Sequence, residues 1–139
     1  MPEARVKEKQ WDQKFEEELL KTWKQEGRHV FNSKSEKPFY VIDTPPPYPS
    51  GSWHIGAVAG YSLIDVCARA QRMLGHEVLF PFGLDRNGIN IELTVERKYG
   101  KSLHEFDRQE FIDLCRQEIR QYCDQIHILA RRIGMSCDF

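Results

Sequence analysis

Apolar residues at helical spacing mark the first part of the chain. In residues 10–27 an aromatic or aliphatic side chain recurs at every fourth position, with charged residues between them. This spacing predicts an amphipathic helix that packs its stripe against the body of the protein and stops at Gly27. The stripe consists of Trp11, Phe15, Leu19 and Trp23.

Two later runs have the composition of strands. Residues 39–44 (FYVIDT) are aromatic and β-branched and predict a short buried strand. The prolines from Pro45 onward end this strand, because proline cannot donate a ladder hydrogen bond. Residues 77–83 (EVLFPFG) predict a second strand, which is interrupted by Pro81.

The segment between the strands returns to helical spacing. Residues 55–74 predict a helix that ends at Gly75, with Ser50 and Ser52 as candidate N-cap residues. Its first turn is rich in glycine, which is costly in a helix and favours close approach of another group to the backbone. The apolar stripe consists of Ala59, Leu63, Cys67, Ala70 and Leu74.

Helical spacing also dominates the last third of the chain. Residues 91–100 predict a short helix closed by Gly100. Asp107 with Glu110 three residues later resembles a capping box, which opens a long helix that ends at Gly134. The apolar positions of this helix are Phe111, Cys115, Ile119, Tyr122, Ile126, Leu129 and Ile133.

The order of these elements indicates the fold class. A strand, a helix of about five turns and a second strand form a parallel, right-handed βαβ unit. Two strands are few for a stable open sheet, and a third is expected in the continuation of the chain. We therefore expect an α/β fold, the N-terminal half of a doubly wound, Rossmann-like parallel sheet with flanking helices and an N-terminal amphipathic helix. Residues 1–37 would form that helix and a connector, and residues 38–139 the incomplete nucleotide-binding domain.

Composition narrows the class of protein. With a net charge of −1 over 139 residues, the chain has no overall electrostatic field that would attract nucleic acid or membrane. A local basic patch is still compatible with this charge. The apolar runs are too short for a bilayer span, and the charged N-terminus is unlike a secretory signal. The four cysteines form no C-x-x-C pair, which favours reduced, structural thiols and a cytoplasmic location over zinc or disulfides.

Candidate chemistry gathers in residues 43–60 (DTPPPYPSGSWHIGAVAG). The prolines make a stiff connector after the first strand, and ligands of such sheets bind beyond the carboxyl ends of the strands. A helix N-terminus there favours phosphate, which His54 could also contact, and Gly56 leaves a flat surface for a purine. His54 could equally be a cap or a surface residue. Asp85 and Glu92, after the second strand, could pair with an ammonium group or cap local turns.

Taken together, these segments resemble the class I aminoacyl-tRNA synthetases. TPPPYPSGSWHIGA resembles their H-I-G-H region, and FPFGLDRNGINIE resembles their G-W-D-x-x-G-L-P-x-E segment. The N-terminal helix is similar to the family's W-x-x-x-W-x-x-x-x-x-F helix, and RIGMSCDF to its LGISVDW-type segments. The resemblance covers nearly the whole chain. IDTPPPYPSG is most similar to valyl-tRNA synthetases, particularly archaeal-type enzymes, with isoleucyl and leucyl enzymes as alternatives.

The resemblance implies a reaction and a set of partners. By this resemblance, the carboxylate of an amino acid would attack the α-phosphorus of ATP, and the aminoacyl group would then pass to tRNA. The resemblance to valyl-tRNA synthetases implies valine as the amino acid. ATP would bring Mg²⁺ with it. His54 would be the catalytic residue and contact an ATP phosphate. The other positions implied for ATP are Gly56, Ala57 and Gly60, and those implied for the amino acid are Pro46, Pro47, Tyr48, Asp85, Asn87 and Gly88, with Asp85 holding the α-ammonium group.

The chain also departs from the family pattern. Ala57 stands where the second histidine of the motif is usual, and Leu84 stands for the tryptophan. Ile89 and Asn90 replace the usual Leu-Pro, which bears on the amino-acid pocket. A K-M-S-K-S-like loop, an editing domain and an anticodon-binding domain are not found in these 139 residues. We expect an N-terminal fragment, a split subunit or a truncated form that is weak or inactive without the remainder of the synthetase or a complementary half.

Two other function classes stay open. A different nucleotidyltransferase with an H-x-G-H motif would normally keep both histidines and lack the aromatic N-terminal helix. A non-catalytic synthetase paralogue that serves as an interaction module is favoured by Ala57. Amino-acid-dependent pyrophosphate exchange would distinguish the synthetase from both.

Overall fold

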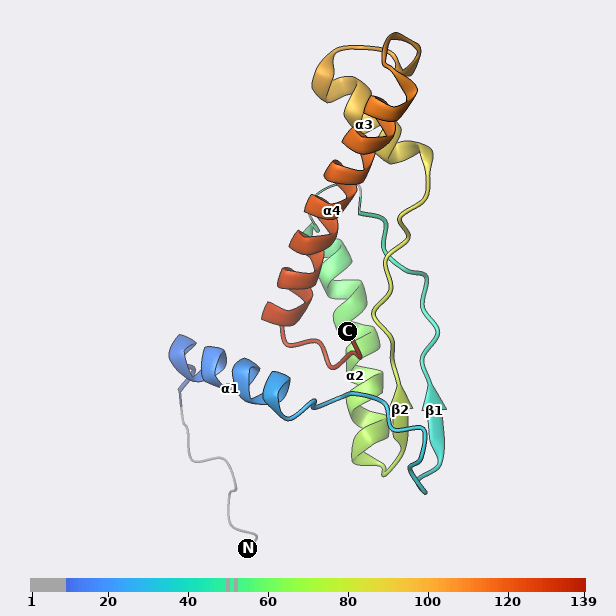
Figure 1. Ribbon diagram of the computed structural model, residues 1–139. Helices are drawn as coiled ribbons and strands as arrows, with labels where there is room; N and C mark the ends of the chain where they lie inside the picture. Colours follow the sequence, from blue (N-terminus) through green and yellow to red (C-terminus); the bar gives the residue numbers. More distant parts are fainter. Residues whose placement is uncertain (1–9, 50, 52) are drawn as a thin grey trace, which may run out of the picture.

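The computed structural model describes residues 10–49, 51 and 53–139. The elements follow the predicted order, with one additional 3-10 turn (Figure 1). They are α1 (Gln13–Gln25), β1 (Phe39–Val41), α2 (Ile55–Met73), β2 (Glu77–Leu79), α3 (Ile89–Tyr99), η1 (Leu103–Glu105) and α4 (Arg108–Arg132). The candidate caps Ser50 and Ser52 lie outside the described residues.

The two strands form the predicted parallel pair. Tyr40 lies opposite Val78, with Phe39 opposite Glu77 and Val41 opposite Leu79. Both strands are shorter than the predicted runs 39–44 and 77–83. One further ladder bond, from the Ile42 N–H to the Leu79 carbonyl at 2.9 Å, extends the pairing toward the proline segment.

The prediction that the first strand is buried is wrong. All residues of β1 are exposed, and 61% of the Val41 surface is accessible. The buried strand is β2 instead: Val78 in β2 and Phe80 directly after it are 2% and 1% exposed. These two side chains join Ala68 of α2 and Ala130 of α4 in the core. Among the described residues β1 has a strand neighbour only in β2, so its apolar side chains mark an open edge.

The last residues of the chain add a third position to the sheet. Asp138 forms a parallel bridge with Pro81, and its N–H donates to the Phe80 carbonyl at 2.8 Å. The Asp138 carbonyl accepts from the Phe82 N–H at 2.9 Å. Successive residues of a strand point their hydrogen-bonding groups to opposite sides. The chain end therefore lies along the edge opposite β1, which makes β2 central.

Helix α2 is confirmed, but its predicted apolar stripe does not face the core. Leu63 and Leu74 of that stripe are each 71% exposed. The buried face contains Ala68 together with Asp65, which is only 8% exposed. A polar residue at the centre of the contact explains why hydrophobic spacing alone selects the wrong face.

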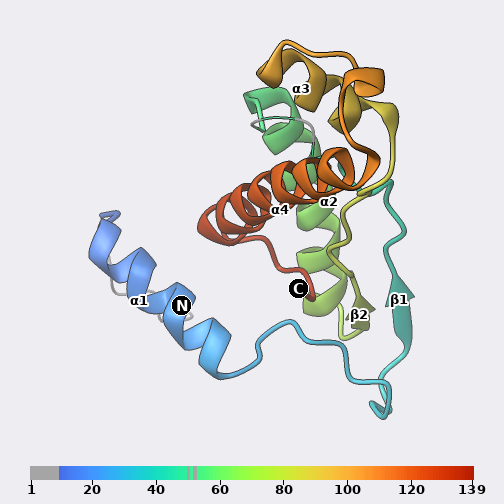
Figure 2. The same cartoon turned by 45° about the horizontal axis from the view of Figure 1, so that its top comes forward.

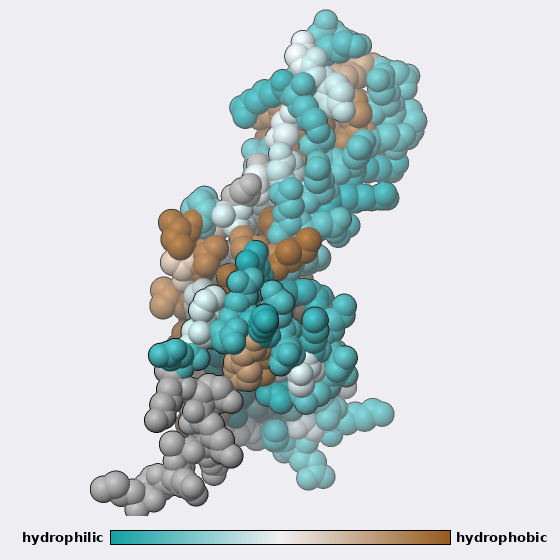
Figure 3. All heavy atoms as spheres, turned by 90° about the vertical axis from the view of Figure 1, so that its left-hand side faces the viewer, coloured by the Kyte–Doolittle hydropathy of each residue, from teal (hydrophilic) through white to brown (hydrophobic). Residues whose placement is uncertain are grey.

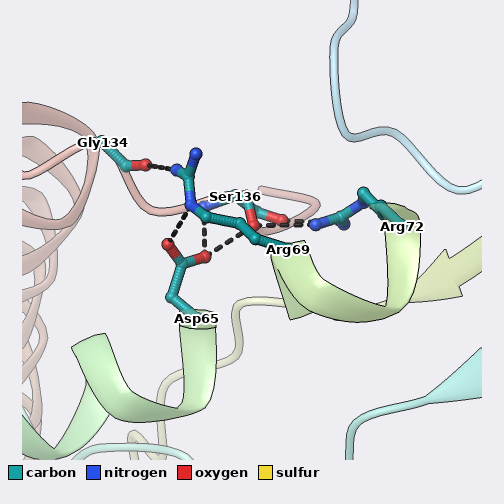
Figure 4. Close-up of polar contacts among 5 residues, drawn as sticks. All are labelled: Asp65, Arg69, Arg72, Gly134 and Ser136. Carbon is teal, nitrogen blue, oxygen red and sulfur yellow. Dashed lines mark hydrogen bonds and ion pairs between the residues drawn. The ribbon is translucent and has the colours of Figure 1, made fainter. Parts of the chain in front are cut away.

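Asp65 belongs to a polar network that joins α2 to the chain end (Figure 4). One carboxylate oxygen accepts from the Ser136 N–H at 2.7 Å and from its hydroxyl at 2.6 Å. The other accepts from Arg69 at 2.7 Å, and Arg69 also donates to the Gly134 carbonyl. Arg72 donates to the Ser136 hydroxyl and carbonyl at 2.7 and 2.9 Å. Because Ser136 is fully buried, these bonds satisfy polar groups that would otherwise be unpaired.

Only the second half of the α1 stripe packs as predicted. Trp11 is 76% exposed and precedes the helix, which begins after the N-cap Asp12. Trp23 is half-buried, packs edge-on against His29 at 5.4 Å between ring centroids, and lies under the Arg69 guanidinium. The N-terminal helix is therefore held at its C-terminal end.

Helices α3 and α4 pack together and extend beyond the sheet (Figures 1 and 2). The Asp107 carboxylate caps α4, accepting from the Gln109 and Glu110 N–H groups at 2.9 and 3.2 Å. Gly100 ends α3 in the left-handed conformation, with φ of 64°, as predicted. A reciprocal capping box that sequence analysis missed joins Ser102 and Glu105 in η1.

The cysteines are unpaired, as predicted. Burial raises the pKa of Cys137 to about 12, which keeps that thiol protonated and unreactive. Cys67 is exposed on α2. In the described parts of the chain, no helix combines the length and the apolar character that crossing a bilayer requires.

Candidate functional site

His54 lies at the N-terminus of α2, where it is the N-cap residue. Its Nδ1 accepts a long hydrogen bond of 3.4 Å from the Ala57 N–H, so the interpretation as a cap is confirmed. A ring nitrogen that accepts a hydrogen bond carries no proton, so in this cap arrangement the donor nitrogen of the ring is Nε2. Because His54 is exposed, Nε2 is a donor available to a ligand.

Gly56 leaves room for this ring. A Cβ atom at position 56 would lie 3.1 Å from both Cε1 and Nδ1 of His54, closer than ordinary contact. A side chain at position 56 would therefore press on the histidine ring, in addition to restricting any approach of a ligand. A Cβ at Gly60 would meet nothing within 4 Å, so this position faces open space.

The proline segment is fixed from the side of α2. The Tyr61 hydroxyl donates to the Pro45 carbonyl at 2.9 Å, and burial raises the Tyr61 pKa. The Tyr61 ring also stacks on Trp53, with centroids 5.0 Å apart and planes 11° apart. Trp53 in turn packs edge-on against Phe82 at 6.0 Å. The residue that precedes His54 is therefore held by aromatic contacts, which sequence analysis missed.

The proline segment also contacts the loop that follows β2. The Asp85 N–H donates to the Pro47 carbonyl at 3.1 Å. A Cβ at Gly83 would lie 3.8 Å from the Cβ of Pro46, so the two loops run side by side. The two segments that carry the sequence motifs thus form one surface at the carboxyl ends of the strands, as expected for a parallel sheet.

A narrow cavity of about 10 Å³ lies between these loops. This volume holds about one water molecule, so a larger ligand requires the loops to open. Tyr48 is 57% exposed and forms part of the wall. The lining residues are Tyr48, Pro49, Asp85, Arg86, Asn87, Gly88, Asn90, Ile91 and Ile119.

Asp85 has one oxygen engaged and one available. Its Oδ1 accepts from the Asn87 N–H at 3.0 Å, so it does cap a local turn, one of the two roles left open. No ion pair of Asp85 occurs among the described residues, which leaves the half-buried carboxylate able to accept from a cation. Gly88 is the N-cap of α3 with φ of 145°, a conformation that strains any residue with a side chain.

The predicted site residues fall into two groups. His54, Gly56, Ala57 and Gly60 occupy the start of α2, whereas Tyr48, Asp85, Asn87 and Gly88 line the cavity. Glu92 lies in the first turn of α3 and lines a different, larger cavity between α3 and α4, not the cavity that Asp85 lines. Arg86, at an unspecified position of the motif segment, and Ile119 of α4 also line the small cavity, and both were missed.

Comparison with known proteins shows to which family the chain belongs. The family model for "tRNA synthetases class I (I, L, M and V)" matches residues 18–139. The chain therefore belongs to the class I aminoacyl-tRNA synthetases. Both motif segments and the helix between them lie within the matched residues.

Within the class, similar curated relatives are archaeal valine–tRNA ligases. The chain is 48% identical to that of Pyrobaculum aerophilum over 130 residues, 93% of this chain and 16% of the relative. It is 46% identical to that of Archaeoglobus fulgidus over 124 residues, 89% of this chain and 14% of the relative. For Aeropyrum pernix the identity is 41% over 141 residues, 96% of this chain and 17% of the relative. The chain thus spans about one-sixth of the length of these relatives.

A solved structure supports the fold. The agnB2 LeuRS of Agrobacterium radiobacter K84, crystallised in a ternary complex with tRNA and LeuAMS, matches with a TM-score of 0.76. The match covers 94% of this chain and 15% of that chain at 24% sequence identity. The partial Rossmann-like fold of a class I synthetase is therefore confirmed.

Proposed function

We propose that this chain forms the part of a valine–tRNA ligase that binds ATP and valine. In this reaction a carboxylate oxygen of valine attacks the α-phosphorus of ATP. The bond from that phosphorus to the bridging oxygen breaks, which gives valyl-adenylate and releases pyrophosphate. The valyl group then passes to the terminal adenosine of tRNA, and AMP leaves. Mg²⁺ would arrive with the ATP phosphates.

One observation carries the proposal: the hydrogen bond from the Asp85 N–H to the Pro47 carbonyl. It joins the two family motif segments, which are far apart in the sequence, at a single cavity. A bond that holds the two segments together limits the conformations they adopt and so reduces the entropy lost when reactants bind. The fixed prolines contribute to the same effect, because their φ angles are already restricted.

His54 fits the role of a phosphate contact. Its Nε2 proton is exposed, and the free N–H groups and partial positive charge at the start of α2 favour an anion at the same place. A donor in that position stabilises charge that develops on the phosphate oxygens during attack. The side chain at position 57 is a methyl group, so a second imidazole donor is not supplied there and a slower reaction is expected.

Asp85 fits the role of the group that holds the α-ammonium of the amino acid. The carboxylate lies in the wall of the cavity, and one oxygen is free to accept from a cation. Charge-assisted hydrogen bonds of this kind contribute roughly 1.5–3 kcal/mol. Opening of the two loops would admit a small aliphatic side chain between Tyr48 and Ile91, which bound the narrow cavity.

The first test measures ligand binding by the chain itself. Calorimetric titration with a non-hydrolysable valyl-adenylate analogue should give saturable binding, and the isoleucyl and leucyl analogues should bind more weakly. Asp85→Asn and His54→Ala should each weaken binding about tenfold or more, from the loss of one charge-assisted hydrogen bond. His104→Ala is the matched control, because His104 is exposed on η1 and makes no described side-chain bond.

The second test measures chemistry. The chain replaces the matching 130 residues of the Pyrobaculum aerophilum valine–tRNA ligase, and the chimera is assayed for valine-dependent pyrophosphate exchange. Activity above background supports a catalytic role. A folded chimera without exchange for any amino acid, while the chain still binds the analogue, would favour the non-catalytic paralogue that Ala57 suggests. Absence of both binding and exchange would remove the proposal.

A further inference from the structure

Helix α2 engages its charged residues with the chain end and leaves an uncharged face outside. Asp65, Arg69 and Arg72 all take part in the network around Ser136. Every exposed position of α2, a helix that the structure describes throughout, is uncharged. We call this surface the outer face of α2. It consists of Ile55, Gly56, Ala59, Gly60, Ser62, Leu63, Val66, Cys67, Ala70 and Met73.

The large side chains of the outer face are mostly accessible. Those of Ile55, Leu63, Val66 and Met73 are between 61% and 88% exposed. Figure 3 shows apolar surface gathered at mid-height along one edge of the molecule, the level at which Figure 1 draws α4 and the upper part of α2. A helix that is apolar on both of its sides is normally buried on both, and monomers rarely leave a contiguous apolar surface open. We therefore expect a second surface to cover the outer face.

The spacing of the outer face is that of a seam between two helices. Ala59, Leu63, Val66, Ala70 and Met73 follow one another at intervals of four and three residues. This alternation is the a and d spacing of a coiled coil, in which each side chain packs between residues of a facing helix. The covering element is thus expected to be another helix, apolar over about 28 Å, because α2 has 19 residues.

The outer face is complementary to itself when two copies pack antiparallel. A two-fold axis between residues 64 and 65, at the midpoint of α2, brings each of these positions level with an apolar or small residue of the second copy. Alanine lies level with alanine in two of the layers, which allows the helix axes to approach to roughly 8 Å. Charged side chains of the described helix do not meet across the axis. The layers pair Leu63 with Val66, Ala59 with Ala70 and Gly56 with Met73 of the second copy, each twice.

We propose that the outer face of α2 is a homodimer interface, in which two copies of this chain pack their α2 helices antiparallel about a two-fold axis. The same residues then serve on both sides of the contact, as a two-fold axis requires. Depletion of charged residues is typical of the core of an interface. One pair of helices is a small interface, so the dissociation constant should lie in the micromolar range. This inference goes beyond the proposed function and does not depend on it.

Sedimentation equilibrium of the chain between about 1 and 200 µM measures the association. Leu63→Glu places a carboxylate without a partner in the central layers and should raise the dissociation constant of the dimer at least about a hundredfold. Ile128→Glu is the matched control, because Ile128 is 65% exposed on α4, outside the outer face. Its dissociation constant should equal that of the parent chain. Circular dichroism verifies that both variants keep their helices.

Cysteine cross-linking tests the antiparallel register. In a Cys67→Ser background, a mixture of the Ala59→Cys and Ala70→Cys chains should form a disulfide between copies. Either chain alone should not, because each position lies about 16 Å along the helix axis from its own equivalent. A disulfide requires Cα atoms within about 7 Å of each other. Cross-links between like positions would indicate a parallel pair and would overturn the proposed arrangement.

The remaining outcomes each decide the inference. A chain that stays monomeric at about 200 µM, or equal weakening of the dimer by Leu63→Glu and Ile128→Glu, overturns it. If the chain is monomeric and Cys67 is protected from alkylation in the chimera, the outer face is covered by the remainder of the synthetase instead, and the inference fails. A dimer that Leu63→Glu dissociates and Ile128→Glu does not, with the expected cross-link, supports it.

These outcomes are distinguishable from those of the proposed function. Leu63 lies outside the candidate site, so Leu63→Glu should bind the valyl-adenylate analogue as tightly as the parent chain. If the analogue binds but no dimer forms, the inference fails and the proposed function stands. If the dimer forms but the analogue never binds, the homodimer interface stands and the ligase proposal fails.

Discussion

Gly56→Ala tests how His54 is held. The added Cβ would lie 3.1 Å from two atoms of the His54 ring, whereas ordinary contacts begin near 3.4 Å. The ring must move by a few tenths of an ångström, and its cap bond to the Ala57 N–H is already 3.4 Å long. We therefore expect the substitution to break the cap and turn Nε2 away from the phosphate position.

Gly56→Ala should change the affinity for the adenylate analogue much more than the free energy of unfolding. Loss of the cap costs about 0.5–2 kcal/mol, and replacing glycine by alanine in a helix restores up to about 1 kcal/mol. The net change in unfolding free energy should therefore be small. The affinity for the adenylate analogue should fall about tenfold or more, because one hydrogen bond to a charged group is worth about 1.5–3 kcal/mol.

Two measurements check this reasoning. Nitrogen-15 NMR reports which ring nitrogen of His54 carries the proton and should show loss of the single Nε2-protonated form. Gly60→Ala is the comparison, because its Cβ meets nothing within 4 Å and cannot press on His54. If Gly56→Ala and Gly60→Ala weaken analogue binding equally, the added methyl groups clash with the ligand and do not act by moving His54. If Gly56→Ala leaves the His54 spectrum unchanged, the steric argument is refuted.

Three further predictions follow from the contacts around this site. Tyr61→Phe keeps the ring but removes the bond to the Pro45 carbonyl; calorimetry should show weaker analogue binding with roughly 1 kcal/mol less stability. Asp65→Asn removes the charge that faces Arg69 in the buried network; thermal or urea unfolding should show a loss of about 1–3 kcal/mol. Burial and then nearby arginines lower the His29 pKa from 6.5 to about 4. The unfolded chain then binds more protons between those values, so stability should fall as the pH drops from 6.5 toward 4, by less than the full shift implies because the ring is partly exposed. His29→Gln should reduce this slope, and an unchanged slope would contradict it.

The sequence predicted the elements better than their burial. The order of helices and strands follows from the spacing of apolar residues and from residues that end an element, such as Pro45 and Gly100. Both signals are local in the sequence. Burial depends on which elements surround a segment, and β1 is exposed because its described neighbour lies on one side only. The face of α2 was mispredicted for a related reason. Its contact with the chain end is centred on Asp65, and hydrophobic spacing cannot register a buried carboxylate whose partners are 71 residues away.

In the candidate site as well, the sequence predicts some residues and misses the contacts that hold them. The motif residues His54 and Asp85 could be selected because their spacing resembles a family pattern. The groups that hold them, Tyr61 and the Pro47 carbonyl, make contacts set by the tertiary fold, and one of them is a backbone atom that every residue type has. The cavity between α3 and α4 was also beyond prediction, because Arg86 of the loop and Arg120 of α4 line it together only through the packing of α4 on α3.

The role of Ala57 changes when the backbone is considered. As a side chain it removes a histidine that the family motif normally supplies, which argues for slower chemistry. Its N–H, however, is the donor that fixes Nδ1 of His54 and leaves the Nε2 proton free. Any residue at position 57 except proline would keep this donor. Under the proposed function, the departure from the motif would remove one phosphate contact without disturbing the orientation of His54. Ala57→His should therefore raise the exchange rate of the chimera and leave the cap bond of His54 in place.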